Sequence, residues 1–423
     1  MKKYKLGEIA DFNVKAISKS DSLQEIIYLD TSSITENVIS DTIIINIEDA
    51  PSRAQRRVKN NTIIYSTVRP RLKHYGILNN PQTNFIVSTG FVTIDLKEQY
   101  KQIIDPRYLY LLLTQSTITE YIGNIADTAV SAYPSINPAD ISSLSFNFPS
   151  FDLQKSVADI WENYDKKIVL NRQINQNLEA MAKQLYDYWF VQFDFPNENG
   201  KPYKSSGGKM VWNEKLKREI PKGWNVLKLG EHCSFNKRTS NGYFNHPILY
   251  LDTSNITNNT IDELQFLNPS SDIIPSRARR LVQEGDIVYS TVRPNLKHFG
   301  IIMNPDYNMV VSTGFAVITA NWSAYRYFIY QFLIQAATIE NLSTIAQSAV
   351  SAYPSINTSD IENLDLVVPP DSMIEKYAKT ACRLYLQIDT NYKEIKSLTK
   401  QRDELLPLLM NGQVSVNSDL SLD

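Results

Sequence analysis

The sequence predicts an α+β protein built from two similar globular modules, each followed by a long α-helix. The first observation is a duplication: residues 28–32, 65–70, 87–91 and 130–137 return almost letter for letter at residues 250–254, 289–294, 311–315 and 350–357. The second observation is that a long stretch with helical periodicity follows each half. A period above 200 residues is too long for a solenoid and indicates a duplicated domain.

The first module, residues 1–150, begins with short strands. Runs of β-branched and aromatic residues, separated by turn residues, predict strands at 26–29, 43–45, 62–65 and 85–87. A helix is expected at about 106–122, with its counterpart at about 325–342. The second module, residues 221–370, has the same internal order and is expected to have the same fold.

The segments 151–193 and 371–412 are expected to be long helices. An apolar stripe at heptad spacing in the first helix predicts that the two helices pair, and a shift of 220 residues gives the same register in the second. The predicted seam comprises Val157, Tyr164, Asn171, Leu178, Leu185, Tyr377, Leu384, Asn391, Leu398 and Leu405. Ile160, Ile174, Met181 and Tyr188 follow three residues later, and Trp161 and Ile168 widen the stripe in the first helix. The matched Asn171 and Asn391 would set the register of the pair; the alternative is that both face solvent.

Residues 194–220 are rich in Pro, Gly, Asn, Lys and Ser, which predicts a linker with turns, and residues 413–423 form a short tail. The two cysteines, Cys233 and Cys382, cannot build a disulfide framework, and no apolar run reaches membrane-spanning length. We therefore expect a cytoplasmic protein with no membrane partner. The net charge of −2 does not decide for or against nucleic acid, because local basic clusters determine phosphate binding.

No catalytic motif is visible in the sequence. The string 207–210 (Gly-Gly-Lys-Met) lacks the upstream glycine and following hydroxyl residue of a phosphate loop, and no G-x-G-x-x-G is present. Four histidines and two cysteines have no metal-ligand spacing. We expect no catalytic residue, no metal site and no cofactor on this chain.

Basic clusters repeat in both modules and are candidates for DNA contact, because arginine grips guanine or phosphate and lysine and short hydroxyls suit phosphate. The candidates are Arg53, Ser66, Arg69, Arg71, Lys73 and His74 in the first module, and Arg277, Ser290, Arg293, Asn295, Lys297 and His298 in the second.

Several alternatives to DNA contact remain open from the sequence. Arg69 could pair internally with Asp30, as Arg293 could with Asp252. Arg53 and Arg277 could lie on a solvated basic face, and the two histidines could be structural. Tyr133 and Tyr353 are expected to be structural, with base stacking as the alternative.

Two further segments are distinctive. The junction runs from Tyr-Trp-Phe-Val at 188–191 through Asp-Phe-Pro at 194–196 to Ile-Pro-Lys-Gly-Trp at 220–224, and the second helix closes with Leu-Leu-Pro-Leu-Leu-Met-Asn-Gly at 405–412. With the duplicated modules, these segments resemble the specificity subunit of type I restriction-modification systems. The resemblance covers essentially the whole chain.

The resemblance implies that each module is a target recognition domain that reads one half of a bipartite DNA site. It implies that the helices pair as an antiparallel coiled coil with internal pseudo-two-fold symmetry and act as a spacer. The implied partners are double-stranded DNA, two methyltransferase subunits and motor-nuclease restriction subunits, with S-adenosylmethionine, ATP and Mg bound by those partners.

The close similarity of the modules predicts two similar half-sites in inverted orientation, and therefore a nearly palindromic site. Position 71/295, where Arg71 faces Asn295, is the first choice for a difference between half-sites, because arginine favours guanine and asparagine favours adenine. Two other classes of function stay open. One is a duplicated protein-interaction adaptor, and the other is a self-contained nuclease with an unrecognised site.

Overall fold

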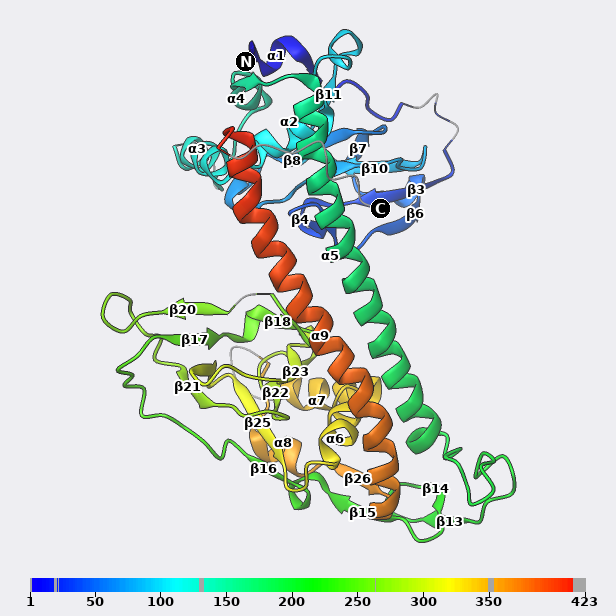
Figure 1. The fold of residues 1–423 in the computed structure, drawn as a ribbon. Coiled ribbons are helices and arrows are strands. Elements are labelled where there is room, and N and C mark those ends of the chain that lie inside the picture. The colour runs from blue at the N-terminus through cyan, green and yellow to red at the C-terminus, as the bar shows by residue number, and fades with distance from the viewer. Residues whose placement is uncertain are drawn as a thin grey trace, which may run out of the picture. The chain divides into compact units, whose positions relative to one another are not determined.

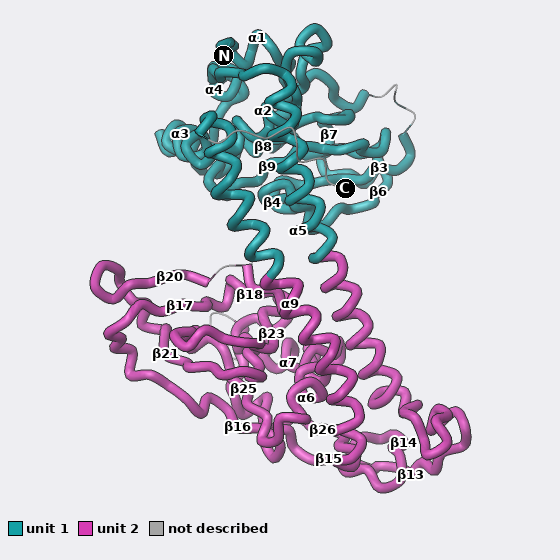
Figure 2. Tube along the Cα trace, in the orientation of Figure 1, with its two compact units in different colours: residues 1–171, 394–423 teal, residues 172–393 magenta. Residues whose placement is uncertain are grey.

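The structure is a computed structural model that describes residues 2–18, 21, 23–128, 133–262, 264–348 and 354–413. The chain forms two compact units, coloured separately in Figure 2. Unit 1 comprises residues 1–171 and 394–423, and unit 2 comprises residues 172–393. Each unit thus holds one module with part of both long helices. Within the described residues, no helix is both long and apolar enough to cross a membrane.

The first module contains two four-stranded sheets with the orders β6-β3-β10-β7 and β2-β11-β8-β9; β3, β6, β7, β8, β10 and β11 are labelled in Figure 1. Strands β3 and β10 pair in parallel, and the other neighbours in these sheets are antiparallel. The four strands expected from the sequence are confirmed as β3, β6, β8 and β10. The sheet strands are β2 (Ala10–Phe12), β3 (Glu25–Leu29), β6 (Ile43–Asn46), β7 (Ala54–Arg57), β8 (Thr62–Ser66), β9 (Tyr75–Leu78), β10 (Phe85–Ser88) and β11 (Phe91–Leu96).

Two short antiparallel ladders complete the strands of this module. They pair β1 (Lys2–Lys5) with β12 (Ser145–Phe148), and β4 (Ile34–Thr35) with β5 (Val38–Ile39).

Strand β8 is buried on both faces. Successive side chains of a strand point to opposite sides of the sheet, so they enter two different clusters. Ile63 and Tyr65 pack into the cluster formed with the helices of the unit, whereas Ile64 packs into a second cluster with Leu29 and Val87 of the other sheet. This arrangement explains why the sequence of β8 reads as a continuous apolar run.

The second module repeats this fold with sheets in the orders β20-β17-β24-β21 and β16-β25-β22-β23. Strands β17 and β24 pair in parallel, as their counterparts β3 and β10 do. The strands are β16 (Cys233–Phe235), β17 (Ile248–Leu251), β20 (Gln265–Leu267), β21 (Ala278–Leu281), β22 (Ile287–Ser290), β23 (Phe299–Ile301), β24 (Met309–Ser312) and β25 (Phe315–Ala320), with the ladders β15 (Asn225–Lys228) to β26 (Asp365–Val368) and β18 (Ile256–Thr257) to β19 (Thr260–Ile261).

One buried hydrogen bond shows how closely the two modules correspond. In the first module the Thr62 hydroxyl on β8 donates to Asp95 on β11 at 2.7 Å. In the second module the aspartate lies next to β22 and the threonine on β25, and the Thr319 hydroxyl donates to Asp286 at 2.6 Å. The donor and acceptor have exchanged places while the bond between the two segments is kept.

The helix expected at 106–122 is wrong in one respect, because two helices occupy this region: α2 (Pro106–Leu113) and α3 (Ser116–Asp127). Gln115 between them is extended, with ψ of 142°, and the Thr114 hydroxyl donates to the Tyr110 carbonyl at 3.0 Å, closing the end of α2. The second module has the same break between α6 (Tyr325–Leu333) and α7 (Ala336–Ser348). The remaining short helices are α1 (Leu6–Ile9), α4 (Pro138–Ser142) and α8 (Thr358–Glu362).

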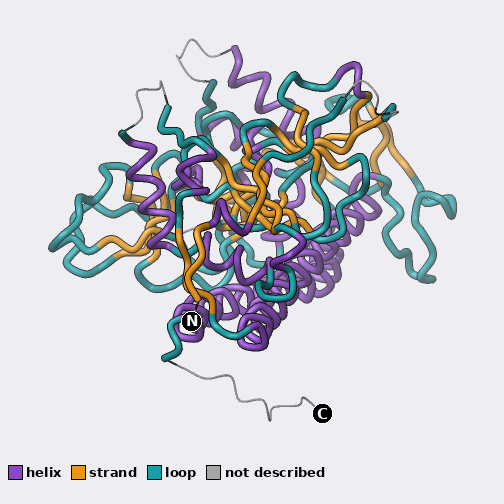
Figure 3. Tube along the Cα trace, turned by 90° about the horizontal axis from the view of Figure 1, so that it is seen from above, coloured by secondary structure: helices purple, strands orange, loops and turns teal. Residues whose placement is uncertain are grey.

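The two long helices are confirmed as α5 (Phe151–Tyr186), continued by a π-helical turn at Asp187–Val191, and α9 (Asp371–Met410). In unit 2, Asn175 contacts Asn391 and Tyr186 packs against Tyr377, so these segments run antiparallel. Figure 3 shows all the helices in purple. In unit 1 the Tyr164 hydroxyl donates to Gln401 at 3.5 Å. Antiparallel pairing is thus seen within a unit, and a coiled coil along the full length of both helices stays a prediction.

Burial along α5 is centred on one edge of the predicted stripe, the edge formed by Trp161 and Ile168. The buried heptad positions are Trp161, Ile168, Asn175, Ala182 and Trp189. They lie one helical turn after the predicted Val157, Tyr164, Asn171, Leu178 and Leu185, of which Val157 alone is fully buried. On α9, Tyr377 and Asn391 are buried as expected, whereas Leu384, Leu398 and Leu405 are half-buried.

The physical reason for this placement is that α5 packs against its module as well as against α9. The Trp161 ring lies 5.2 Å from the ring of Tyr110 on α2, so the centre of burial falls between the two contacts. Ile174, Met181 and Tyr188 are therefore turned outward and exposed.

The buried asparagine pair also differs from the prediction. Asn391 donates to the Asn175 side-chain oxygen at 2.8 Å, and Asn175 donates to the Ile388 carbonyl at 3.3 Å. Asn171, the repeat-matched partner expected from the sequence, is half-buried. The register-setting polar contact of unit 2 is thus Asn175–Asn391.

The linker at 194–220 is more ordered than expected, since it contains an antiparallel hairpin of β13 (Met210–Asn213) and β14 (Arg218–Pro221). Two of its aromatic residues, Phe195 and Tyr203, pack into the core of unit 2, because the Phe195 ring stacks on Trp224 at 5.1 Å and on Tyr203 at 4.6 Å. Burial of these rings holds the segment against the second module.

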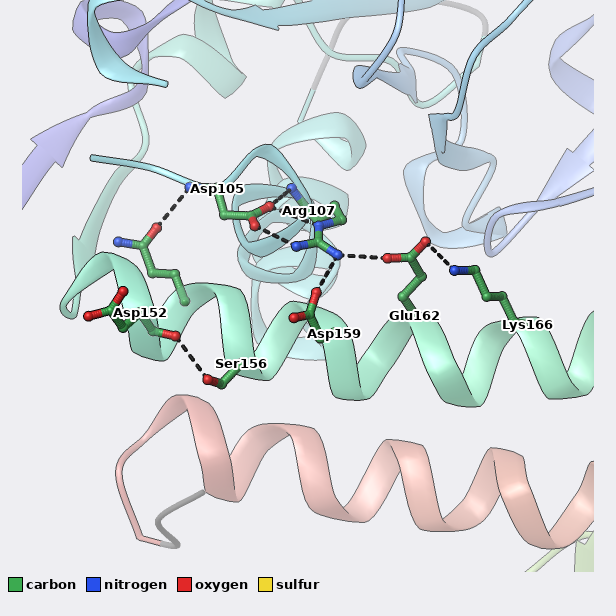
Figure 4. A network of polar contacts seen from close by, with 8 residues as sticks. Asp105, Arg107, Asp152, Ser156, Asp159, Glu162 and Lys166 are labelled. Atoms are coloured by element: carbon green, nitrogen blue, oxygen red, sulfur yellow. Dashed lines mark hydrogen bonds and ion pairs between the residues drawn. The ribbon is translucent and has the colours of Figure 1, made fainter. Parts of the chain in front are cut away.

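An ion network attaches α2 to α5 in unit 1 (Figure 4). The Arg107 guanidinium contacts Asp105 at 2.7 Å, Asp159 at 2.7 Å and Glu162 at 2.6 Å. The hydrogen bond to Asp105 is the main reason that the pKa of Arg107 is raised above its ordinary value. At the positions of Asp159 and Glu162, α9 has Lys379 and Cys382, so it lacks these two acidic partners.

Candidate nucleic-acid interface

The motifs that repeat between the modules converge in space. In the first module, backbone hydrogen bonds join Thr67 to Gly90 (2.9 Å), Thr89 to Arg53 (2.8 Å) and Arg69 to Pro134 (2.8 Å). The same bonds recur at 2.9 Å in the second module, where they join Thr291 to Gly314, Thr313 to Arg277 and Arg293 to Pro354. We call these assemblies the loop clusters: residues 30–33, 52–54, 66–69, 88–90 and 133–136 in the first module, and 252–255, 276–278, 290–293, 312–314 and 354–356 in the second.

The repeated glycine of each loop cluster is required by close packing. A Cβ atom on Gly90 would lie 2.8 Å from the Thr31 methyl group, and one on Gly314 would lie 2.8 Å from the Thr253 methyl group. A side chain at either position would push the loops apart, so glycine is needed for the loops to approach. The repeated motifs 28–32 and 87–91 are thus explained as two sides of one contact.

Arg69 and Arg293 adopt the same unusual backbone conformation. Each has φ of 48°, in the left-handed region, and begins a short 3-10 turn at Pro70–Leu72 or Pro294–Leu296. Non-glycine residues adopt this conformation at an energetic cost, and such residues concentrate at functional sites. The repeated strain indicates that the direction of these two side chains matters.

The Arg69 side chain is exposed and lies over the exposed ring of Tyr133, 4.9 Å from its centroid. The alternative pairing with Asp30 is absent from the described residues, because Asp30 accepts hydrogen bonds from the Tyr28 and Thr31 hydroxyls at 2.7 and 3.0 Å. Burial opposes the charge of Asp30, but these hydrogen bonds outweigh it and lower the pKa of its carboxyl. Asp252 likewise accepts from the Tyr250 hydroxyl at 3.2 Å. Tyr353, the counterpart of Tyr133, lies outside the described residues.

Arg53 and Arg277 are exposed at the edge of the loop clusters. Each contributes its backbone carbonyl to the loop cluster, and in the described part of the chain neither guanidinium has an ion pair or a hydrogen bond. An exposed guanidinium with an ordered backbone and no internal partner is suited to grip a phosphate or a guanine edge. These two residues are the strongest candidates among those named from the sequence.

Ser66 and Ser290 are removed from the candidate set by their burial. Their side chains are 1% and 2% exposed, and each hydroxyl donates to a backbone carbonyl, of Val68 or Val292, at 2.9 Å. They shape the loop that carries the arginine and have no surface to offer to DNA.

The Arg71 side chain is held by contacts with other residues of the first module. Its guanidinium contacts Asp127 at 2.6 Å, Asn124 at 2.7 Å and Glu120 at 3.1 Å, all on α3, and it packs over Gly123. The hydrogen bond to Asp127 is the largest cause of its raised pKa. Its counterpart Asn295 is exposed. Position 71/295 is thus a structural difference between the modules; the contacts with α3 argue against a base-reading role for Arg71, which stays a prediction.

His74 and His298 use one ring nitrogen inside the protein. Nδ1 of His74 lies 2.6 Å from the Ile34 carbonyl, and Nδ1 of His298 lies 2.7 Å from the Ile256 carbonyl. A proton on Nδ1 satisfies this contact and leaves Nε2 as the nitrogen that could face a ligand. The contact of Nδ1 supports a structural role for both histidines, and a DNA contact through Nε2 stays a prediction.

Lys73 and Lys297 close the two 3-10 turns with left-handed backbones, φ of 57° and 58°. Lys73 forms an ion pair with Glu36 at 2.6 Å. Lys297 is exposed, and no ion pair within the described residues involves it.

Two pairs were missed by the sequence reasoning. Asn37 accepts from the Ile77 amide at 2.9 Å and donates to Asp165 on α5 at 3.3 Å, and Asn259 accepts from the Ile301 amide at 2.9 Å and donates to Glu179 on α5. These asparagines attach each module to a long helix. Their common place after Thr35 and Thr257 in the duplicated segments was the signal that could have found them.

The chain is similar to known proteins along most of its length. The sequence matches the type I restriction modification DNA specificity domain twice, over residues 1–180 and 221–400. The chain is 25% identical, over an alignment of 468 residues, to the specificity subunit of the type I restriction enzyme HindI of Haemophilus influenzae, with 98% of this chain and 99% of the relative covered. It is 26% identical over 379 residues to the MjaIX specificity subunit of Methanocaldococcus jannaschii, covering 87% of this chain and 81% of the relative. A solved structure of the S subunit of a type I restriction-modification system from M. genitalium matches in fold, with a TM-score of 0.51 and 15% identity over 96% of this chain and 95% of that one.

Proposed function

The chain belongs to the family of type I restriction modification DNA specificity domains, and from this premise we propose that it is the DNA-recognition and scaffold subunit of a type I restriction-modification complex. Each module would read one half of a bipartite DNA site. The observation that carries this proposal is the convergence of the repeated motifs on one loop cluster per module, with Arg53 and Arg277 exposed beside it.

The chain would perform no chemistry of its own. In the described residues no group of three or more metal-binding side chains is present, and no catalytic constellation is visible in the sequence. S-adenosylmethionine, ATP and Mg would be bound by two methyltransferase subunits and by the restriction subunits that dock on this chain. Two free cysteines fit a reducing cytoplasm.

The two half-sites would be similar and inverted. Matching backbone bonds and matching arginine conformations support a common way of contacting DNA in both modules. Antiparallel helix segments would turn one module by 180° relative to the other, and duplex DNA has local two-fold axes that suit this arrangement.

The experiment is to assemble the chain with its methyltransferase subunits and to map the modified DNA motif by methylation-sensitive sequencing. We expect a bipartite, nearly palindromic motif. Two unrelated half-sites would refute the inverted-repeat proposal. Methylation or cleavage by the chain alone would favour a self-contained enzyme, and absence of any footprint in the presence of the methyltransferase would favour an adaptor.

Variants of the exposed arginines test which residues carry recognition. Arg53→Ala and Arg277→Ala should each weaken DNA binding by about 1–3 kcal/mol, and should relax one position of one half-site if the residue touches a base. An equal weakening on all sequences would place the residue on phosphate. Arg71→Ala is the matched control, because removal of its α3 anchor should lower the melting temperature of the free protein.

A further inference from the structure

The two modules are built alike but are not charged alike at the turn that follows the loop cluster. The backbones around Lys73 and Lys297 match: the Glu36 amide donates to the Lys73 carbonyl at 2.9 Å, and the Asn258 amide donates to the Lys297 carbonyl at 3.0 Å. At position 36/258 the first module has the carboxylate of Glu36, and the second has the neutral amide of Asn258.

The carboxylate neutralises the lysine of the first module. Lys73 Nζ lies 2.6 Å from Glu36 Oε1, whereas Lys297 has no carboxylate partner in the described part of the chain. Glu36 holds φ of 46°, a left-handed conformation that asparagine tolerates far better than glutamate does. Glu36 thus pairs with Lys73 from a backbone conformation that is costly for a glutamate.

A second position changes the charge in the same direction. Gln55 donates to the Ser52 carbonyl at 2.7 Å, and its counterpart Arg279 donates to the matching Ser276 carbonyl at 2.9 Å. The arginine therefore keeps the structural bond of the glutamine and adds a positive charge. Arg279 is exposed and directly follows the loop-cluster segment 276–278.

We propose that the second module supplies more of the phosphate binding of this protein than the first, through Lys297 and Arg279. This proposal rests on the proposed function. Lys297 lies one 3-10 turn after Arg293, so a duplex held by the loop cluster would have its backbone close to this lysine. Lys73 occupies the equivalent place but is held by Glu36.

The test is the salt dependence of DNA binding by the chain assembled with its methyltransferase subunits. Each phosphate that a cationic side chain neutralises contributes about 0.9 to the slope of log affinity against log salt. Removal of one such side chain should therefore reduce the change in affinity between 50 and 200 mM salt by about 3.5-fold. Lys297→Ala and Arg279→Gln should each produce this reduction. Lys73→Ala, the matched control, should leave the slope unchanged.

Exchange variants test the charge itself. Glu36→Gln frees Lys73 without changing side-chain length, and should increase the salt-dependent change in affinity by up to about 3.5-fold. Gln55→Arg should do the same while keeping the bond to Ser52. Melting temperatures of all variants would show that the fold is retained.

Equal effects of Lys73→Ala and Lys297→Ala, or no effect of either, would overturn the proposal. Failure of the proposed function is a separate result: the wild-type complex would then bind its own motif and a scrambled duplex equally well. A complex that prefers its motif while the two lysine variants behave alike would reject the asymmetry alone.

Discussion

Two arginines of the first module, Arg53 and Arg71, are suited to different roles because their neighbouring residues differ. Arg71 is anchored by Asp127, Asn124 and Glu120, while Arg53 is exposed with no side-chain partner in the described residues. An anchored guanidinium must break its internal hydrogen bonds before it can bind DNA. A free guanidinium has no such bonds to break, which is why Arg53 and Arg277 rank above Arg71 as DNA ligands.

Glu179 on α5 gives a prediction about pH. Burial raises its pKa to about 7, above the ordinary value of 4.5, although the carboxylate accepts a hydrogen bond from Asn259. The native state therefore holds this proton more tightly than the unfolded state does. The stability that protonation contributes is full below pH 4.5 and is lost as the pH rises through 7.

We expect the melting temperature of the wild type, relative to that of Glu179→Gln, to fall between pH 5 and pH 8. The raised pKa of Glu179 corresponds to a change of as much as about 3 kcal/mol in the free energy of unfolding. The glutamine keeps an oxygen for Asn259 and removes the titration, so it is a matched control. Parallel pH profiles for the two proteins would contradict the prediction.

At the scale of elements, the long helices are shaped by what covers them on both sides. The seam of α5 faces its own module through Trp161 and faces α9 through Asn175. A polar contact in such a seam favours one register, because every other register would bury an unpaired amide.

The asparagine contact in the seam can be tested by substitution. Asn175→Leu leaves the buried Asn391 amide without its partner and should lower the free energy of unfolding by about 1–3 kcal/mol. Changing both residues to leucine should restore most of that stability, because no buried polar group is then left unpaired. Asn171→Leu, at the half-buried position, should change stability by less than about 0.5 kcal/mol. Thermal or urea unfolding measures all three, and a larger destabilisation by Asn171→Leu than by Asn175→Leu would refute the assignment.

At the scale of the whole molecule, each compact unit takes part of both long helices. Residues 394–413 pack with the first module, and Leu406, Leu409 and Met410 belong to the same core cluster as Leu109 of α2. The end of the described chain is therefore part of the unit in which the chain begins. A consequence is that both helices must be changed together if the spacing of the modules is to change while the packing is kept.

Insertion of one heptad into each helix should lengthen the unspecified gap of the DNA site. The insertions belong between residues 171 and 172 and between residues 393 and 394, where the two units meet along the sequence. Seven residues add about 10 Å of helix, or about three base pairs at roughly 3.4 Å each. Sequencing of the modified motif should show unchanged half-sites and a longer gap. An active complex with the original gap would rule out a role for the helices as a spacer, and insertion into α5 alone should impair folding.

Much of the architecture was determined by the sequence itself. Runs of β-branched and aromatic residues predicted β3, β6, β8 and β10, helical periodicity predicted α5 and α9, and the duplicated strings predicted one fold used twice. These signals are local or repeated, so they can be read without knowing which segments touch. The basic clusters and their matched positions were visible for the same reason.

The tertiary structure alone decided which charges are free and which edge of the apolar stripe of α5 is most buried. Arg71 meets partners 49 to 56 residues away and Lys73 meets one 37 residues away, so only the folded chain brings these groups together. The break between α2 and α3 and the shift from Asn171 to Asn175 likewise depend on packing. Local pattern determines which element forms, whereas the partner of a side chain depends on contacts between segments that are distant in the sequence.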